Sequence, residues 1–250
     1  MIKSLDPVFF VSDIHLGLRI DGVKEREMKF YNFLKSLPED TAALYLLGDI
    51  FDFWYEYKFV IPSGHTRVLG KLAELVDRGV EVVFVNGNHD IWTYRFLQDE
   101  IGLKVFSKPI EVDICGSIFY LGHGDGLGYS SFGYKFLQFL FKNRIIQVLF
   151  SSLHPRWAFG LGYAWSKHTR LAKVQSDNKY VFRGEEEPIY KYANSIGQRK
   201  KIDYFIFGHF HSPYRAVLPS GAELIILGEW INNFDYLVFE GDKIERRIFG

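Results

Sequence analysis

Residues 8–15 read Val-Phe-Phe-Val-Ser-Asp-Ile-His, a run of apolar side chains followed by a polar cluster. This order is typical of a buried strand that delivers polar residues at its carboxyl end. In extended backbone, side chains two residues apart face the same side. We therefore expect Asp13 and His15 to form one pincer, and the same spacing predicts a second pincer from His209 and His211.

Strand and helix patterns alternate after this first strand, which predicts an α/β core with parallel strands. The second half of the core is rich in strands. We expect helices at Lys24–Leu37, Thr66–Asp77 and Ile91–Glu100, and strands at Ala43–Leu47, Glu81–Val85, Val105–Ile114, Ser117–Leu121, Tyr204–Phe207, Tyr214–Leu218, Glu223–Leu227, Tyr236–Phe239 and Lys243–Ile248.

The composition is that of an ordinary globular protein. Its 250 residues, 48% of them hydrophobic, allow a single domain with a sizeable core. Basic and acidic residues number 30 each, so no overall electrostatic field attracts nucleic acid. Cys115 is the single cysteine, which favours a reducing compartment. We find neither a signal peptide at Met1–Ser12 nor about 18 uninterrupted apolar residues, so we expect a cytoplasmic protein.

One stretch differs in composition from the rest. Gly126–Ser176 contains seven Lys or Arg residues, no Asp or Glu, and eleven aromatic residues. Tyr134–Phe150 has amphipathic helical spacing, which Pro155 and the glycines around Gly160 interrupt later. We interpret residues about 126–180 as a helical cap inserted in a single domain of residues 1–250. A basic amphipathic surface favours membrane contact. The alternative is a helix that packs on the core with solvated charges.

Three further polar motifs follow predicted strands. They are Gly48-Asp-Ile-Phe-Asp52, Gly87-Asn-His-Asp90 and Gly122-His-Gly-Asp125. In α/β sheets, residues at the carboxyl ends of strands form the functional site, and glycines allow close backbone approach there. Carboxylate, imidazole and amide ligands without thiolate suit Mn²⁺, Zn²⁺ or Fe. A single motif is explained equally well by a capped turn, but the set indicates a metal site. His65 follows Ser-Gly in a predicted loop, and we expect it to be exposed.

The ordered motifs D-x-H, GDxxD, GNHD, HGD and GHxH resemble those of the calcineurin-like metallophosphoesterase superfamily. The resemblance covers residues about 8–125 and 203–250. It implies a sandwich of two mixed β-sheets flanked by helices, with two divalent metal ions at the strand ends. It also implies two ligand sets that share Asp49. One set is Asp13, His15, Asp49 and His211, and the other is Asp49, Asn88, His123 and His209.

The same resemblance gives two other residues catalytic roles. His89 stands beside the ligand Asn88, where it can protonate a leaving group or stabilise transition-state charge. Asp52 is expected to hydrogen-bond His89 and to fix its tautomer. Two cations would activate water and clamp the phosphoryl oxygens. We expect Mn²⁺ to be the best activator.

The cap region resembles the UDP-2,3-diacylglucosamine pyrophosphatase family of lipid A synthesis. The stretches that carry this likeness are His123-Gly-Asp-Gly-Leu127, Tyr134, Trp165-Ser-Lys-His-Thr-Arg170 and Asp49-Ile-Phe-Asp-Phe-Trp54. The chain departs from the best-known members by carrying His89 in place of an arginine, and Ser130-Ser131 in place of acidic residues. The resemblance implies that Tyr134, Lys167 and Arg170 contact the substrate.

This resemblance implies cleavage of UDP-2,3-diacylglucosamine to UMP and 2,3-diacylglucosamine 1-phosphate, with attack at the α-phosphorus. The enzyme would then work at the cytoplasmic face of the inner membrane as a peripheral protein. One alternative is a phosphoesterase that acts on a soluble phosphodiester, phosphomonoester or nucleotide. Another is a non-catalytic scaffold of the same fold, which we expect to have lost metal ligands. A nuclease lacks support, because the chain has no long basic track.

Overall fold

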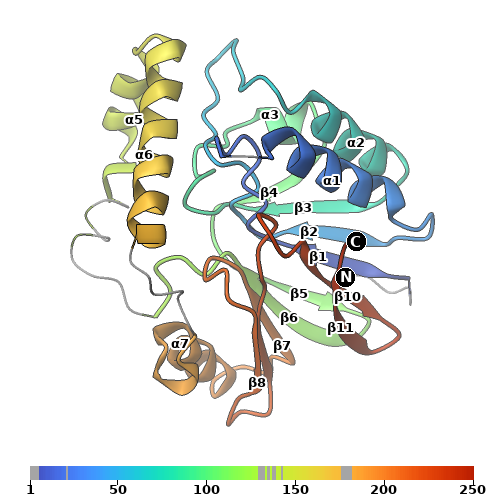
Figure 1. Ribbon diagram of the computed structural model, residues 1–250. Coiled ribbons are helices and arrows are strands. Elements are labelled where there is room, and N and C mark those ends of the chain that lie inside the picture. The colour runs from blue at the N-terminus through green and yellow to red at the C-terminus, as the bar shows by residue number, and fades with distance from the viewer. Residues whose placement is uncertain are drawn as a thin grey trace.

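A computed structural model describes residues 6–20, 22–128, 133, 136, 139–141, 143–175 and 182–250, with the main chain alone at residue 165 and residues 167–175. Two mixed β-sheets face each other, and helices lie outside them (Figure 1). The predicted fold class is confirmed. Apolar residues from both sheets fill the space between them, where Phe10 and Phe119 stack with ring centroids 5.6 Å apart.

The first sheet has six strands in the order β11-β10-β1-β2-β3-β4. Strands β1 to β4 run parallel, whereas β10 and β11 are antiparallel and place β10 beside β1. Strands β1 to β3 are almost completely buried, which explains their continuous apolar sequences. The strands are Val8–Val11 (β1), Ala43–Leu46 (β2), Glu81–Val85 (β3), Lys104–Phe106 (β4), Asp235–Glu240 (β10) and Lys243–Ile248 (β11).

The second sheet has five strands in the order β5-β6-β7-β9-β8. The three central strands run parallel, and antiparallel strands close both edges. The carboxyl ends of β6 and β7 therefore lie together, where each delivers a histidine motif. The strands are Ile110–Ile114 (β5), Ser117–Gly122 (β6), Tyr204–Phe207 (β7), Tyr214–Val217 (β8) and Glu223–Ile226 (β9).

Helices cover the outer face of each sheet (Figure 1). Helices α1 (Val23–Ser36) and α2 (Thr66–Asp77) pack on the first sheet through one apolar cluster that includes Phe30 of α1. Helix α7 (Pro188–Gly197) packs on the second sheet. A 3₁₀ turn at Gly184–Glu186 precedes α7. Neither element was predicted from the sequence.

Two predicted elements are wrong in extent. The single strand Val105–Ile114 is two strands in different sheets, β4 and β5. Pro109 lies at the break, where it has no N–H to offer a strand ladder. The helix expected over Ile91–Glu100 is only α3, Phe96–Asp99. The Glu56 carboxylate accepts hydrogen bonds from the N–H groups of residues 94, 95 and 96, and this capping sets the start of the helix.

Helices α5 (Arg144–Ser151) and α6 (Pro155–Gln175) stand side by side at one edge of the sandwich (Figure 1). The predicted interruption at Gly160 is wrong, since α6 continues through it. A glycine inside a helix lowers its stability without ending it. Phe150, Phe159 and Tyr163 of these helices pack on an aromatic cluster made by Phe53, Tyr55 and Trp92 of the core. The division into one domain with a cap at about 126–180 stays a prediction.

His65 is buried, with 3% of its surface exposed, so its predicted exposure is wrong. It stands at the start of α2 and its ring contacts Phe51, with centroids 5.2 Å apart. Burial lowers its pKa to about 4. Within the described part of the chain, no helix is both long and apolar enough to cross a membrane.

Candidate metal centre

The polar motifs predicted from the sequence meet at the carboxyl ends of strands from both sheets. The loops after β1, β2 and β3 come from the first sheet, and those after β6 and β7 from the second. Both sheets therefore contribute to one site, as the strand-end rule requires. The seven residues predicted as ligands in these loops are Asp13, His15, Asp49, Asn88, His123, His209 and His211.

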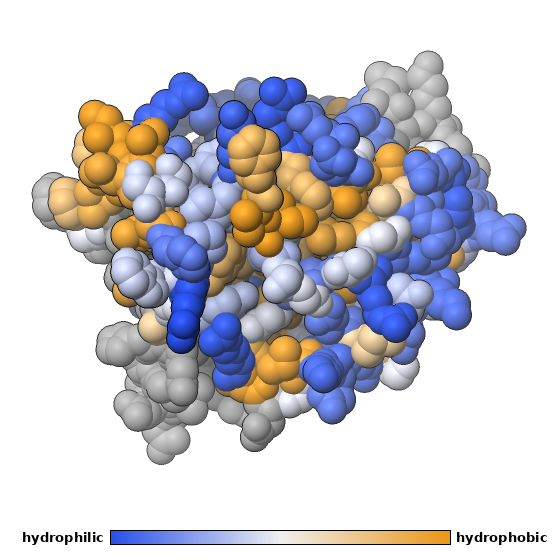
Figure 2. All heavy atoms as spheres, turned by 90° about the horizontal axis from the view of Figure 1, so that it is seen from above, coloured by the Kyte–Doolittle hydropathy of each residue, from blue (hydrophilic) through white to orange (hydrophobic). Residues whose placement is uncertain are grey.

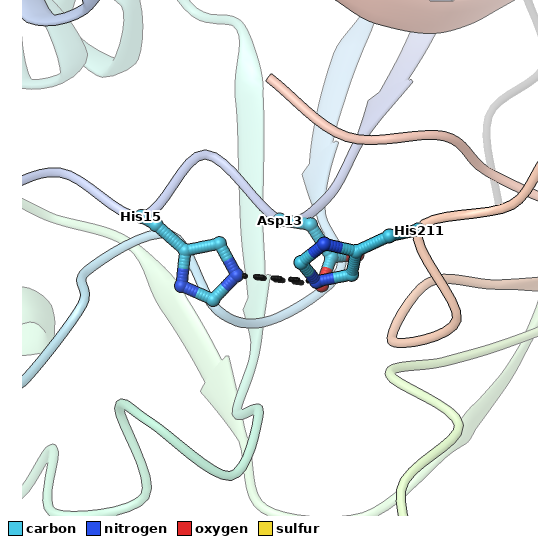
Figure 3. Close-up of side chains that lie close together, drawn as sticks. All are labelled: Asp13, His15 and His211. Carbon is cyan, nitrogen blue, oxygen red and sulfur yellow. Dashed lines mark hydrogen bonds and ion pairs between the residues drawn. The ribbon is translucent and has the colours of Figure 1, made fainter. Parts of the chain in front are cut away.

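A first group consists of Asp13, His15 and His211 (Figure 3). The distance from His211 Nε2 to Asp13 Oδ1 is 3.0 Å, and that from His15 Nε2 to the same oxygen is 3.7 Å. The two histidine Nε2 atoms are 3.4 Å apart. Three ligand atoms thus face one point from two loops that are distant in sequence.

A second group consists of Asp49, His123 and His209. His123 Nε2 lies 3.4 Å from Asp49 Oδ2, and His15 Nε2 of the first group lies 3.8 Å from the same oxygen. Asp49 therefore stands between the two groups. The Nδ1 atom of His123 is 2.9 Å from the main-chain oxygen of Leu47, which fixes Nε2 toward Asp49.

The prediction of extended backbone at Asp13 with His15, and at His209 with His211, is wrong. Asp13 and His15 both have positive φ, of 56° and 51°. His209 and His211 also have positive φ, and they belong to different groups. Five of the eight described non-glycine residues with positive φ are predicted ligands, Asp49 being the fifth. Such strained conformations cluster at functional sites, where the surrounding structure holds them in place.

The glycine of one motif is required by close packing. A Cβ atom on Gly208 would overlap both the Ser12 hydroxyl and Asp13 Oδ2. The main-chain N–H of His209 donates to that carboxylate oxygen at 2.9 Å, and the Ser12 hydroxyl donates to it at 2.7 Å. The predicted close approach of backbone at this glycine is therefore confirmed, and it orients Asp13.

Asp90 is a site residue to which the sequence analysis assigned no role. Its carboxylate is fully buried and accepts hydrogen bonds from four main-chain N–H groups. The shortest two come from Ile50 and Gly87, both at 2.7 Å, and the others from Asp49 and Phe51. One side chain thus ties the loop of Asp49 to the loop of Asn88. Its place at the end of the Gly-Asn-His-Asp motif was the only sequence signal.

His89 lies at the edge of the two groups, with its Nε2 3.9 Å from Asp49 Oδ2. The predicted hydrogen bond to Asp52 exists, but the main-chain oxygen of Asp52 makes it, 2.8 Å from His89 Nδ1. The Asp52 carboxylate is 4.0 Å from this nitrogen and 3.6 Å from Nδ1 of His15. A carbonyl partner requires the proton on Nδ1, which leaves Nε2 facing the site.

Charges within the site determine the protonation of its members. Burial raises the pKa of Asp13, but the charge of His211 and hydrogen bonds from both histidines outweigh burial and hold this pKa well below its usual value. Burial likewise opposes the charge of His123, yet Asp49 raises the pKa of that imidazole well above 6.5. Since a metal ligand must be unprotonated, metal binding here competes with protons.

The residues present fit divalent cations. The Oδ1 atom of Asn88 is buried and has no hydrogen-bond partner among the described residues. Such an amide oxygen is costly unless a ligand pairs with it. Carboxylate, imidazole and amide donors are the set that Mn²⁺, Zn²⁺ and Fe accept. The described residues therefore fit divalent cations.

The chain matches the calcineurin-like phosphoesterase family over residues 7–213. The chain belongs to this family. The resemblance drawn from its motifs is thereby confirmed, and membership makes the chain a metal-dependent hydrolase. The solved structure of TT1561 from Thermus thermophilus is similar with a TM-score of 0.50 and 12% identity, covering 99% of this chain and 100% of that one. At this identity the likeness concerns the fold alone.

Curated relatives cover almost the whole chain. The UDP-2,3-diacylglucosamine hydrolase of Porphyromonas gingivalis is 36% identical over 95% of both chains. The protein of the same name from Neisseria gonorrhoeae is 29% identical, over 94% of this chain and 95% of its own. That from Hahella chejuensis is 27% identical, over 90% and 89%.

The structure does not describe the side chains of the three residues predicted to contact the substrate. Tyr134 lies outside the described residues. Lys167 and Arg170 lie in α6, but their side chains are outside the description. Their roles stay predictions.

Proposed function

We propose that this chain hydrolyses UDP-2,3-diacylglucosamine to UMP and 2,3-diacylglucosamine 1-phosphate. The observation that carries the proposal is the 36% identity, over 95% of both chains, to a relative named for hydrolysis of this compound. The cluster of ligand residues supports it, since a scaffold without activity has no need to keep these groups together.

Two divalent cations, with Mn²⁺ the best activator, complete the proposed centre. Asp13, His15, Asp49 and His211 would hold the first, and Asp49, Asn88, His123 and His209 the second. The cations supply Lewis acidity, which lowers the pKa of water and neutralises phosphoryl oxygens. Elemental analysis of the purified chain is expected to give two ions per chain. A fully active protein with one ion per chain contradicts this assignment.

His89 is proposed to act on the leaving group. Its Nδ1 is held by the main-chain oxygen of Asp52 at 2.8 Å, so Nε2 faces the reacting centre. With Nδ1–H donating to that carbonyl, a proton for the departing phosphate must come from Nε2 of the imidazolium form, and the same form can stabilise charge that develops on the leaving group. Asp52 orients this ring through its main-chain oxygen. Its carboxylate lies nearer to His15 than to His89.

The cap is proposed to bind the acyl chains, with Tyr134, Lys167 and Arg170 near the substrate. The aromatic cluster beside Phe53 shows that α5 and α6 present apolar side chains toward the core. Burying even four methylene groups there contributes about 3 kcal/mol, roughly a 100-fold gain in affinity. The cap would thus select lipids over soluble phosphoesters.

The outer side of the cap is proposed to touch the cytoplasmic surface of the inner membrane. Hydrophobic side chains gather on the side where α5 and α6 lie, at the left in Figure 2. Among the side chains of these two helices that the structure describes, the large exposed apolar residues are Ile145, Val148, Leu149, Trp157 and Leu161. Sedimentation with vesicles tests this, and Val148→Ser with Leu149→Ser is expected to weaken it. Unchanged sedimentation contradicts the membrane contact.

The substrate assignment is tested with two nucleotide sugars that differ in their acyl chains. We expect kcat/KM for UDP-2,3-diacylglucosamine to exceed that for UDP-N-acetylglucosamine by at least about 100-fold, from the burial estimate above. Reaction in ¹⁸O-labelled water is expected to place the label in UMP, because attack falls on the α-phosphorus. A chain that ignores the lipid but cleaves soluble nucleotides well supports the alternative phosphoesterase, and label in the sugar phosphate contradicts the point of attack.

A further inference from the structure

Ser166 connects the cap to the metal centre directly. It lies on α6 and is 1% exposed. Its hydroxyl donates a hydrogen bond to Asp52 Oδ1 at 2.7 Å, and Asp52 is itself 2% exposed. A buried hydroxyl that donates to a buried carboxylate makes a strong, charge-assisted bond. This is a polar contact between the cap and the motif that holds Asp49.

The oxygen that accepts this hydrogen bond also faces a predicted metal ligand. Asp52 Oδ1 lies 3.6 Å from Nδ1 of His15. On its other side, His15 turns Nε2 toward Asp13 and Asp49, at 3.7 Å and 3.8 Å. One carboxylate oxygen therefore links the hydroxyl of α6 to the ring that would hold the first cation.

Packing fixes the register of α6 at this point. Gly162 lies one helical turn before Ser166, so both face the same side of the helix. A Cβ atom on Gly162 would lie 2.6 Å from ring atoms of Phe53, the residue next to Asp52. The close approach that glycine permits places the Ser166 hydroxyl within reach of the carboxylate.

We propose that Ser166 is a positioning residue for the first cation, acting through Asp52 on His15. With its hydroxyl donating to Oδ1, the carboxylate is held 3.6 Å from His15 Nδ1, beyond hydrogen-bond distance, where its charge can act on the ring. The partner of a ligating histidine commonly changes metal affinity by about 10–100-fold. Coupling between sites is reciprocal, so a cation that fixes His15 also stabilises the docking of α6. The inference rests on the ligand assignment proposed above.

Metal titration of the apo chain by calorimetry tests the first half of this inference. Ser166→Ala is expected to weaken one of the two Mn²⁺ binding steps by about 10-fold, and Ser166→Thr, which keeps the hydroxyl, to restore it. Leu161→Ala is the matched control, because it shortens an exposed side chain of the same helix. Equal weakening by Leu161→Ala, or affinity unchanged within about twofold in Ser166→Ala, overturns the proposal.

Hydrogen exchange of α6 tests the second half. In the unmodified chain, saturating Mn²⁺ is expected to slow amide exchange in residues 162–170 by about 10-fold, the same factor by reciprocity. In Ser166→Ala the cation is expected to leave exchange there unchanged. A metal effect of equal size in both proteins overturns the coupling. Neither measurement uses the lipid substrate, so a wrong substrate assignment leaves both outcomes intact.

Discussion

The buried ring of His65 predicts how the stability of the chain depends on acidity. It is 3% exposed, and neither ring nitrogen has a hydrogen-bond partner among the described residues. Burial lowers its pKa from 6.5 to about 4. In the folded chain the ring is therefore neutral at pH values where an exposed histidine already takes up a proton.

The magnitude follows from the two pKa values. Above about pH 6.5 the ring is neutral in both states, so its contribution is fully present. As pH falls from 6.5 toward 4, the unfolded chain binds a proton that the folded chain does not, and stability is lost. Each pH unit is worth about 1.4 kcal/mol, so roughly 3 kcal/mol disappears across this window.

Urea unfolding at several pH values between about 7 and about 4 measures this loss. His65→Leu removes the titrating group, so the gap in unfolding free energy between the two proteins is expected to change by about 3 kcal/mol. The same substitution at exposed His154 is the matched control. Parallel curves for the unmodified chain and His65→Leu refute the reasoning, because they mean that the ring reaches water in the folded state.

Four other substitutions probe the centre itself. Asn88→Ala is expected to lower the metal content measured by elemental analysis, whereas His89→Ala should keep both ions and lose about 10²–10⁴-fold in kcat; loss of metal from the His89 variant would contradict its role. Asp90→Asn keeps an acceptor for only one pair of its four N–H donors, so urea unfolding should show a loss of about 3 kcal/mol or more. Gly208→Ala forces a Cβ atom against Asp13, and calorimetry should show weaker metal binding.

Much of this structure was predictable from local sequence. The strand Glu81–Val85 and the helix Thr66–Asp77 have the bounds that their apolar patterns indicate. The two mixed sheets followed from the motif resemblance. The residue types at the strand ends indicated a metal site, because they repeat after several strands. These features depend on periodicity and residue chemistry, which a sequence displays directly.

Other features depend on contacts between segments distant in sequence. The positive φ of His209 and His211 replaces the extended backbone that their alternate spacing indicated, although the motif resemblance had already assigned the two rings to different ligand sets. Asp90 looks like one more candidate ligand until its four main-chain partners are known. The carboxylate of Asp52 accepts a hydrogen bond from Ser166 of α6 and lies 3.6 Å from His15 Nδ1, contacts that join three segments distant in sequence.

The position of β10 beside β1 has a consequence for how the chain folds during its synthesis on the ribosome. Leu237 of β10 pairs with Phe10, and the N–H of Trp230 donates to the main-chain oxygen of Asp13 at 3.0 Å. His211, the third member of the first group, also belongs to the last fifth of the sequence. A nascent chain therefore displays Asp13 and His15 long before their partners emerge, and such non-local pairing is slow to form. On the proposed ligand assignment, metal loading of the first site therefore follows synthesis of the loop that carries His211.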